Sequence, residues 1–331
     1  MTRKLGSHGP AVSSSIGLGA MGMSWAYGPA DRAESIATIH AALDAGINLV
    51  DTGDFYGMGH NEMLIAQALE GRNREEVLIS VKFGAQRAPD GSWIGYDARP
   101  AAVETALAYS LQRLRTDYID IYRPARLDAA VSIEETVGAI ADMVRAGYVR
   151  SVGLSEVGPE TIRRAAATHP ICDLQIEYSI ISRGIEEEIL PTCRELGIGI
   201  TAYGVLSRGL LSGHWSPDRE LESSDFRTRA PRFQGENLSR NLALVEALRE
   251  IAAGKGATVA QIAIAWVLAR GEDIVPLVGA RTPERLAEAL GALEVELTDE
   301  DLERIEEAVP PGAAAGERYP EPQMAHLDSE R

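Results

Sequence analysis

Short runs of β-branched and other apolar residues alternate with longer amphipathic runs along most of the chain. A small hairpin is expected first, with strands at residues 4–5 and 11–12 on either side of a turn. Beyond it, the apolar runs predict eight strands, at residues 15–18, 48–51, 77–82, 118–122, 149–154, 174–178, 199–203 and 274–277.

The amphipathic runs between these strands predict helices with ordinary start and stop residues. Asp31 is a candidate N-cap and Pro100 a favoured first-turn residue, while Gly46 and Gly147 are candidate stops. The predicted helices span residues 31–45, 61–70, 100–114, 133–145, 159–168, 185–196, 239–253, 259–269, 283–290 and 299–308. A long polar loop over residues 204–234 separates the seventh strand from its helix.

Eight strand-then-helix units argue for a parallel sheet that is covered by helices. We predict an α/β fold in which the sheet closes into a (β/α)8 barrel, with an N-terminal hairpin and extra C-terminal helices. An open doubly wound sheet is the alternative, but no GxGxxG follows the first strand. Residues 1–331 are expected to form one domain, and the Gly-, Pro- and Ala-rich tail over 310–331 is expected to be mobile.

Composition narrows the function classes. The 331 residues are 45% hydrophobic and 24% charged, which is typical of a globular protein, and the net charge is −17. Without a Lys- or Arg-dense block, so acidic a chain is a poor binder of nucleic acid or of an anionic membrane. Cys172 and Cys193 are too far apart for a CxxC site, and no signal-like apolar segment opens the sequence. These features favour a cytoplasmic protein with reduced thiols.

Three residue types suited to proton transfer fall at the ends of neighbouring strands. Asp51 ends the second predicted strand, Tyr56 follows it, and Lys82 ends the third. In a barrel, strand ends meet at one rim, so these side chains are expected to converge. A nearby ammonium is expected to lower the pKa of the Tyr56 phenol, and a carboxylate would hold that ammonium in place. A salt bridge between two strands, beside an unrelated tyrosine, is the alternative.

These residues lie in segments that resemble the aldo-keto reductases. The matching segments are DTGDFYG at 51–57, VKFG with Lys82, YIDIY, GLSE, QIEYS, TAYGVLSRGLL and VPLVGARTPERLAEAL, in family order and spacing from Arg3 to about Val309. The resemblance implies a barrel that binds NADPH and reduces an aldehyde or ketone, a small-molecule carbonyl substrate, by hydride transfer. It assigns Tyr56 as proton donor, supported by Asp51 and Lys82.

The resemblance also implies a set of cofactor contacts. Asp51 and the backbone of Gly19 and Met21 would lie near the nicotinamide, Ser155 and Gln175 would bind its carboxamide, and Tyr203 would stack on its ring. Leu206, Ser207 and Gly209 would form the pyrophosphate loop, and Arg281, Thr282 and Arg285 would bind the 2′-phosphate of NADPH. Taken without the resemblance, Arg281 and Arg285 are an ordinary solvated helix face. No metal site is expected.

The sequence departs from the family where a catalytic histidine usually ends the fourth strand. Ala125 stands at that position, and none of the six histidines lies on this strand. The loss removes a hydrogen-bond donor from the carbonyl site, and such a donor is worth about 3 kcal/mol in a transition state. Arg126 matches the residue that usually follows and is not expected to replace it; His60 is a weak candidate. Glu156 and Ala289 each stand where the family commonly has Asn.

Rim aromatics such as Trp25, Tyr27, Trp93 and Tyr96 suit an apolar substrate, although local loop packing explains each equally well. Three functions stay open. The favoured one is an NADP-dependent oxidoreductase acting on CH–OH or carbonyl groups. A non-catalytic NADPH-binding subunit that reports redox state, as in the potassium-channel β subunits that share this barrel, would explain Ala125. An aldolase with Lys82 as a Schiff-base amine would leave Arg281 and Arg285 without a purpose.

Overall fold

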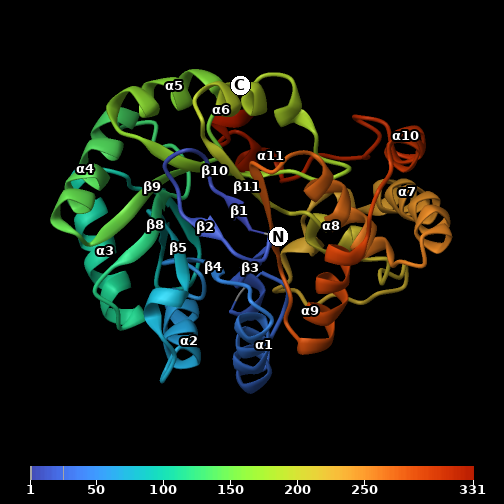
Figure 1. Cartoon of the computed structure of the whole chain (residues 1–331), viewed down its shortest axis with the longest axis horizontal. Coiled ribbons are helices and arrows are strands. Elements are labelled where there is room, and N and C mark those ends of the chain that lie inside the picture. The colour runs from blue at the N-terminus through green and yellow to red at the C-terminus, as the bar shows by residue number, and fades with distance from the viewer. Residues whose placement is uncertain (1, 25) are drawn as a thin grey trace.

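Eight parallel strands close into a barrel in the computed structural model, which describes residues 2–24 and 26–331. Trp25, one of the expected rim aromatics, lies outside the described residues. In order around the barrel the strands are β3 (Gly17–Gly19), β4 (Leu49–Gly53), β5 (Leu78–Phe83), β8 (Ile119–Pro124), β9 (Val149–Ser155), β10 (Ile171–Glu177), β11 (Gly199–Tyr203) and β12 (Ile274–Val278) (Figure 1). Parallel pairing of β12 with β3 closes the ring, which confirms the predicted (β/α)8 barrel.

Helices surround the barrel, as the amphipathic runs predict (Figure 1). Those that follow the strands are α1 (Arg32–Asp44), α2 (His60–Ala68), α3 (Pro100–Leu114), α4 (Ile133–Ala146), α5 (Pro159–Thr168), α6 (Ile189–Glu195) and α9 (Pro283–Leu290). To one side, α7 (Gly235–Gly254) packs against α8 (Val259–Ala269) and against α10 (Asp299–Ala308). Only one bent pair, α7 with α8, has the length and composition of a membrane span; no single described helix does.

The expected caps are present. Asp31 accepts a hydrogen bond from the Glu34 backbone N–H at 2.8 Å and starts α1. Gly147 ends α4 with a φ of +88°, a left-handed conformation that glycine adopts without a steric penalty. The helix bounds therefore follow from local sequence chemistry as well as from packing.

The N-terminal hairpin covers one end of the barrel. Strands β1 (Arg3–Lys4) and β2 (Ala11–Val12) pair antiparallel and lie across the centre of the barrel in Figure 1. Leu5 and Val12 are fully buried there, in a cluster with Leu49 at the start of β4 and Cys172 near the start of β10. Because this end is closed by apolar contacts, the strand C-terminal ends form the open mouth.

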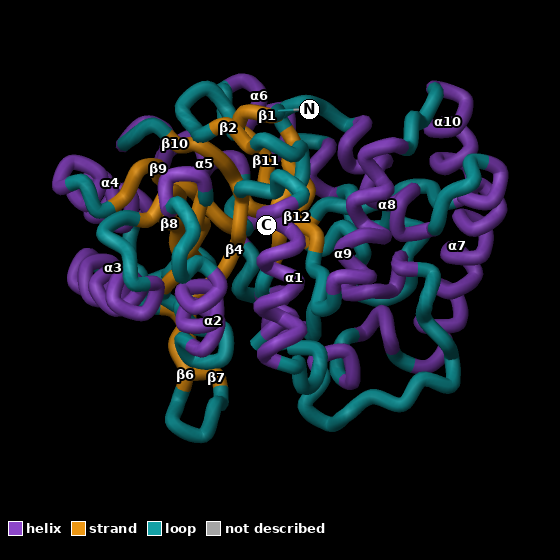
Figure 2. Tube along the Cα trace, turned by 60° about the horizontal axis from the view of Figure 1, so that its bottom comes forward, coloured by secondary structure: helices purple, strands orange, loops and turns teal. Residues whose placement is uncertain are grey.

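Two features of the mouth differ from the expectation. A second hairpin, β6 (Ala85–Arg87) and β7 (Trp93–Tyr96), follows β5 and projects from the barrel (Figure 2). Its strands, of three and four residues, are too short to stand out in the sequence. The tail that was expected to be mobile instead packs against the barrel, forming the short helix α11 (Glu321–Met324), with Leu327 buried.

Candidate active site

Asp51 and Lys82 form a buried ion pair at the mouth. Adjacent strands β4 and β5 carry them, and the Lys82 Nζ lies 2.5 Å from Asp51 Oδ1. The other carboxylate oxygen, Oδ2, accepts hydrogen bonds from Ser80 Oγ at 2.8 Å and from Gln175 Nε2 at 2.7 Å. Asp51 is therefore fixed on both oxygens, and it orients the ammonium of Lys82.

Tyr56 lies beside this pair. It sits in the turn between β4 and α2, and its side chain is only 7% exposed. The Lys82 Nζ lies 5.1 Å from the centre of the Tyr56 ring. The structure thus brings together the three residues that the strand ends predict, and we call Asp51, Lys82 and Tyr56 the relay.

The protonation states of the relay differ from the expectation in one respect. Burial and, after it, the charge of Asp51 raise the pKa of Tyr56 well above its ordinary value of 10.0. The prediction that the ammonium lowers this pKa is therefore wrong for the protein alone. Burial also lowers the pKa of Lys82, although Asp51 opposes that effect. Tyr56 therefore carries its proton at neutral pH, although a raised pKa makes the phenol a weaker acid in the protein alone.

A buried polar network inside the barrel supports the relay and escaped the sequence analysis. Arg123 on β8 donates to Asp173 Oδ2 at 2.9 Å and to Ser80 Oγ at 3.1 Å, and Ser80 in turn donates to Asp51. Thr201 also donates to Asp173. The signal for this network is a charged residue within an apolar strand, as in IDIYRP and ICDLQ.

The residues expected at the carboxamide lie side by side. Ser155 ends β9 and is the register partner of Gln175 on β10, and both are buried. Gln175 donates one amide hydrogen to Asp51, so it connects the expected carboxamide site to the relay. Gly19 pairs with Asp51 across β3 and β4, and Met21 starts the short turn that follows. These four expected contacts therefore flank the relay.

Tyr203 ends β11 at the same mouth and contacts the tail. Its hydroxyl donates to Glu156 at 2.6 Å and lies 2.9 Å from the hydroxyl of Tyr319. Glu156, where the family commonly has Asn, is held by two hydrogen bonds from Arg318 at 2.9 and 2.6 Å. The side chain of Arg318 is almost fully buried. The tail is thus attached to the rim by charged and hydroxyl groups.

The expected phosphate-binding residues occupy two neighbouring segments. After Leu206, the residues Ser207, Arg208 and Gly209 have φ angles of +44°, +56° and +92° in succession. The N–H groups of Ser207 and Gly209 donate to the backbone carbonyls of Gly204 and Leu206, at 2.6 and 2.9 Å, so hydrogen bonds within the loop hold this tight turn. Thr282 caps α9 by accepting a hydrogen bond from the Arg285 N–H at 3.3 Å.

The two arginines beside Thr282 differ in their partners. Arg281 donates to the backbone carbonyls of Tyr27 and Pro29, at 3.0 and 3.2 Å, and forms no ion pair among the described residues. Arg285 is half exposed and pairs with Glu288 at 3.0 Å. Arg281 therefore keeps its charge available at the N-terminus of a helix, where anions are favoured.

The position of the family histidine holds no donor. Ala125 is 2% exposed, directly after β8, and its backbone N–H donates to Phe83 O at 2.8 Å. His60 does not replace the imidazole, because Ser24 contacts its Nδ1 at 2.9 Å and Arg32 its Nε2 at 3.2 Å. The structure thus offers no histidine to a carbonyl group beside Tyr56.

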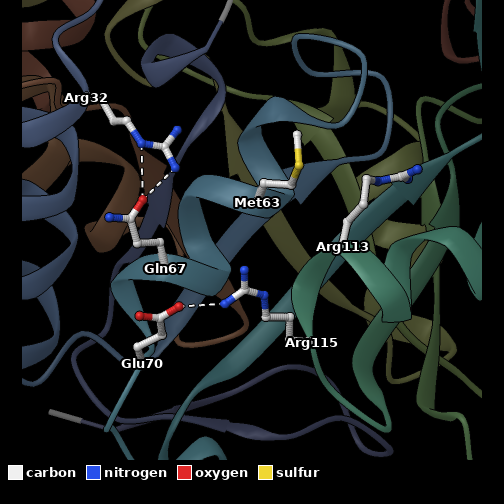
Figure 3. A pocket seen from close by; sticks show the side chains of 6 residues that line it. All are labelled: Arg32, Met63, Gln67, Glu70, Arg113 and Arg115. Carbon is white, nitrogen blue, oxygen red and sulfur yellow. Dashed lines mark hydrogen bonds and ion pairs between the residues drawn. The ribbon is translucent and has the colours of Figure 1, made fainter.

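Two surface cavities lie apart from the relay. One, of about 260 Å³, lies on the outer wall between α1, α2 and α3 (Figure 3). Its arginines already have partners: Arg32 donates to Gln67, and Arg115 pairs with Glu70 at 2.6 Å. The other, of about 250 Å³, lies between the β6–β7 hairpin, the loop after β8 and the tail. Tyr96 and Leu127 line it, so this second cavity adjoins the mouth.

Comparisons with known proteins agree with the geometry. The model of the Aldo/keto reductase family matches residues 15–310. A probable aldo-keto reductase from Glycine max is 44% identical over 319 residues, covering 96% of this chain and 91% of that protein. A glycerol dehydrogenase from Gluconobacter oxydans superposes with a TM-score of 0.85 at 30% identity, covering 93% of this chain and 94% of that one.

A third relative, an aldo-keto reductase from Bacillus halodurans solved in its holo form, superposes with a TM-score of 0.76 at 28% identity. That match covers 96% of this chain and 98% of the other. Sequence and structure agree over nearly the whole length. The chain therefore belongs to the aldo-keto reductase family, oxidoreductases that act on carbonyl and alcohol groups with a nicotinamide cofactor.

Proposed function

We propose that this protein reduces an aldehyde or ketone to the alcohol with NADPH and that Tyr56 donates the proton. The observation that carries the proposal is the relay: a buried phenol beside an ammonium that a buried carboxylate holds at 2.5 Å. These groups come from two adjacent strand ends at the open mouth of the barrel. Acid catalysis needs a proton donor at such a position.

The residues around the relay fit a dinucleotide. Ser155 and Gln175 offer a hydroxyl and an amide at one end, and the left-handed run at Ser207–Gly209 follows the end of β11 at the same mouth. At the other end, Arg281 has no carboxylate partner and lies next to the start of α9. A guanidinium at a helix N-terminus suits a phosphate monoester, which favours NADPH over NADH.

When it is bound, the cofactor supplies a hydride to the carbonyl carbon. Tyr56 then transfers its phenolic proton to the carbonyl oxygen as negative charge develops there. Lys82 stabilises the resulting phenolate, since its ammonium lies against the ring. Asp51 keeps that ammonium in place, and burial of all three groups strengthens their interactions by excluding water.

The absence of a side-chain donor at Ala125 is expected to slow carbonyl reduction. An imidazole at this position would donate a hydrogen bond to the carbonyl oxygen, and a methyl group cannot. The expected cost is about 3 kcal/mol, or roughly a hundredfold in rate, for a substrate with no other polar anchor. The same observation supports the second candidate function, a non-catalytic NADPH-binding subunit that reports redox state, but the intact relay favours the enzyme.

The test is to mix the protein with NADPH and a panel of aldehydes and ketones, and to follow the absorbance of the reduced nicotinamide. Oxidation of NADPH that requires the carbonyl compound would support the proposed carbonyl reduction. Tight NADPH binding with no turnover across the panel would favour the redox-reporting subunit, and no nucleotide binding would contradict both. We also propose a cytoplasmic location, supported by the two free and buried thiols of Cys172 and Cys193.

A further inference from the structure

Arg126 occupies the mouth immediately beside the position of the missing histidine. Its half-buried side chain folds back, so that Nη1 donates to the carbonyl of Ala125 at 2.6 Å and approaches Ser155 Oγ at 3.5 Å. Its guanidinium carbon lies 6.0 Å from the centre of the Tyr319 ring. The charged group is thus located between the ends of β8 and β9 and the tail.

This guanidinium has no carboxylate in direct contact, unlike five other arginines of the barrel interior and mouth. Those five all form ion pairs, namely Arg123 with Asp173, Arg208 and Arg232 with Glu177, Arg227 with Asp225, and Arg318 with Glu156. Among the described residues Arg126 forms no ion pair, and its Nε and Nη2 donate no hydrogen bond. Like Arg281 at the start of α9, Arg126 thus carries a charge with no carboxylate in direct contact among the described residues, in a chain of net charge −17.

The charge of Arg126 acts on the residues that face the substrate. Burial and Asp51 raise the pKa of Tyr56, and Arg126 opposes that rise. Burial likewise raises the pKa of Tyr96, again against Arg126. The guanidinium therefore lies within electrostatic reach of the proton donor and of an aromatic that lines the neighbouring cavity. Glu156 acts on Arg126 through space and raises its pKa, but it makes no hydrogen bond to Arg126, since Arg318 donates to both of its oxygens.

We propose that Arg126 binds a carboxylate on the substrate, so that the enzyme prefers oxo acids, compounds that carry both a carbonyl and a carboxylate. The proposal rests on the proposed carbonyl reduction and specifies its substrate class. A half-buried guanidinium without a counterion is costly, and a bound carboxylate removes that cost through a two-pronged hydrogen bond. A phosphate dianion fits less well, since one cation that already interacts with Glu156 through space would leave its second charge unbalanced.

Binding of the substrate carboxylate by Arg126 would also explain how the enzyme works with alanine at position 125. Holding the substrate by its carboxylate fixes the direction of the carbonyl toward Tyr56, and orientation of this kind lowers a barrier without a separate donor to the oxygen. A neutral aldehyde would lack the anchor and would show the full cost of the missing imidazole. For oxo acids, the charge at position 126 then offsets the missing imidazole at position 125.

The first experiment compares two aldehydes of equal chain length, 4-oxobutanoate and butanal, in the wild-type protein with NADPH. We expect kcat/KM to be at least about tenfold higher for the oxo acid. In Arg126→Gln the ratio of the two values should fall by about ten- to a hundredfold, mainly through KM of the oxo acid, and Arg126→Lys should restore part of it. The charge-matched control is Arg240→Gln, an exposed arginine on α7, which should keep the wild-type ratio.

The second experiment needs no turnover. Succinate binding is measured by calorimetry in the presence of NADP⁺, and the dissociation constant should rise at least about tenfold in Arg126→Gln. Equal dissociation constants, or butanal reduction without any preference for the oxo acid, would overturn the proposal. Binding of succinate that depends on Arg126, with no carbonyl reduced, would instead refute the proposed reduction and leave the anion site standing.

Discussion

The ammonium of Lys82 lies 2.5 Å from one oxygen of Asp51, and both side chains are buried at the mouth of the barrel. A buried ion pair is costly unless the remaining lone pairs are satisfied. Here Ser80 and Gln175 satisfy the second oxygen of Asp51. The pair is therefore fixed in one geometry, which allows it to position the ammonium against the ring of Tyr56.

The interior network behind this pair should be important for stability. Arg123→Met leaves the fully buried Asp173 without its partner, and an uncompensated buried charge costs about 3–5 kcal/mol. Urea unfolding should show that loss in free energy of unfolding. The double variant Arg123→Met/Asp173→Leu removes both charges and should recover most of it. A loss below about 1 kcal/mol in the single variant would mean that the pair does not hold the barrel interior.

Asp54 should make the protein less stable as the pH rises. Burial, together with the charge of Glu62, raises the pKa of Asp54 from 3.8 to about 7. The folded state then binds more protons than the unfolded state between these values, so stability is greatest near pH 4 and falls as the pH approaches 7. Asp54→Asn should add on the order of 4 kcal/mol at pH 8 and almost nothing at pH 4.

Thermal unfolding across this pH range measures the effect of Asp54. The exposed Asp117→Asn serves as the control, since it removes the same charge at the surface. A pH dependence that is the same in Asp54→Asn and in the wild type would show that Asp54 ionises normally.

Restoring the family imidazole should raise the rate with neutral substrates. Ala125→His places a donor beside the relay, and we expect kcat/KM for butanal to rise about ten- to a hundredfold. Steady-state assays with NADPH measure this. An unchanged rate would mean that another group already donates to the carbonyl oxygen.

The two arginines beside Thr282 should determine the choice of cofactor. Arg281→Gln/Arg285→Gln removes both positive charges near the start of α9, where we place the 2′-phosphate. The dissociation constant for NADPH should rise about ten- to a hundredfold, while that for NADH changes less than threefold. Protein fluorescence titration gives both constants, and an equal change for the two nucleotides would place the 2′-phosphate elsewhere.

Local chemistry in the sequence was enough to predict most of the fold. Asp31, Pro100 and Gly147 start or end helices where predicted, because caps and stops depend on a few neighbouring residues. The start of β10 was missed by three residues, since the charged Asp173 interrupts the apolar pattern. Only its long-range partner Arg123 makes that charge compatible with a buried strand.

For the candidate site too, the sequence predicted some features, and others became visible only in the structure. Strand ends alone predict that Asp51, Tyr56 and Lys82 meet, because barrel topology brings those ends together. The pKa of Tyr56 is raised, opposite to the expected direction, because burial and the charge of Asp51 act on it, and the sequence does not reveal that burial. The role proposed for Arg126 also depends on structure, since a missing counterion is visible only once every other carboxylate at the mouth is placed.

The central claim is that the hydroxyl of Tyr56 supplies the proton for carbonyl reduction. The most direct measurement compares kcat for 4-oxobutanoate in the wild type and in Tyr56→Phe, with NADPH affinity determined for both by fluorescence titration. We predict that the variant binds NADPH within about threefold of the wild type and loses at least about a thousandfold in kcat. Turnover by Tyr56→Phe at the wild-type rate would contradict the account.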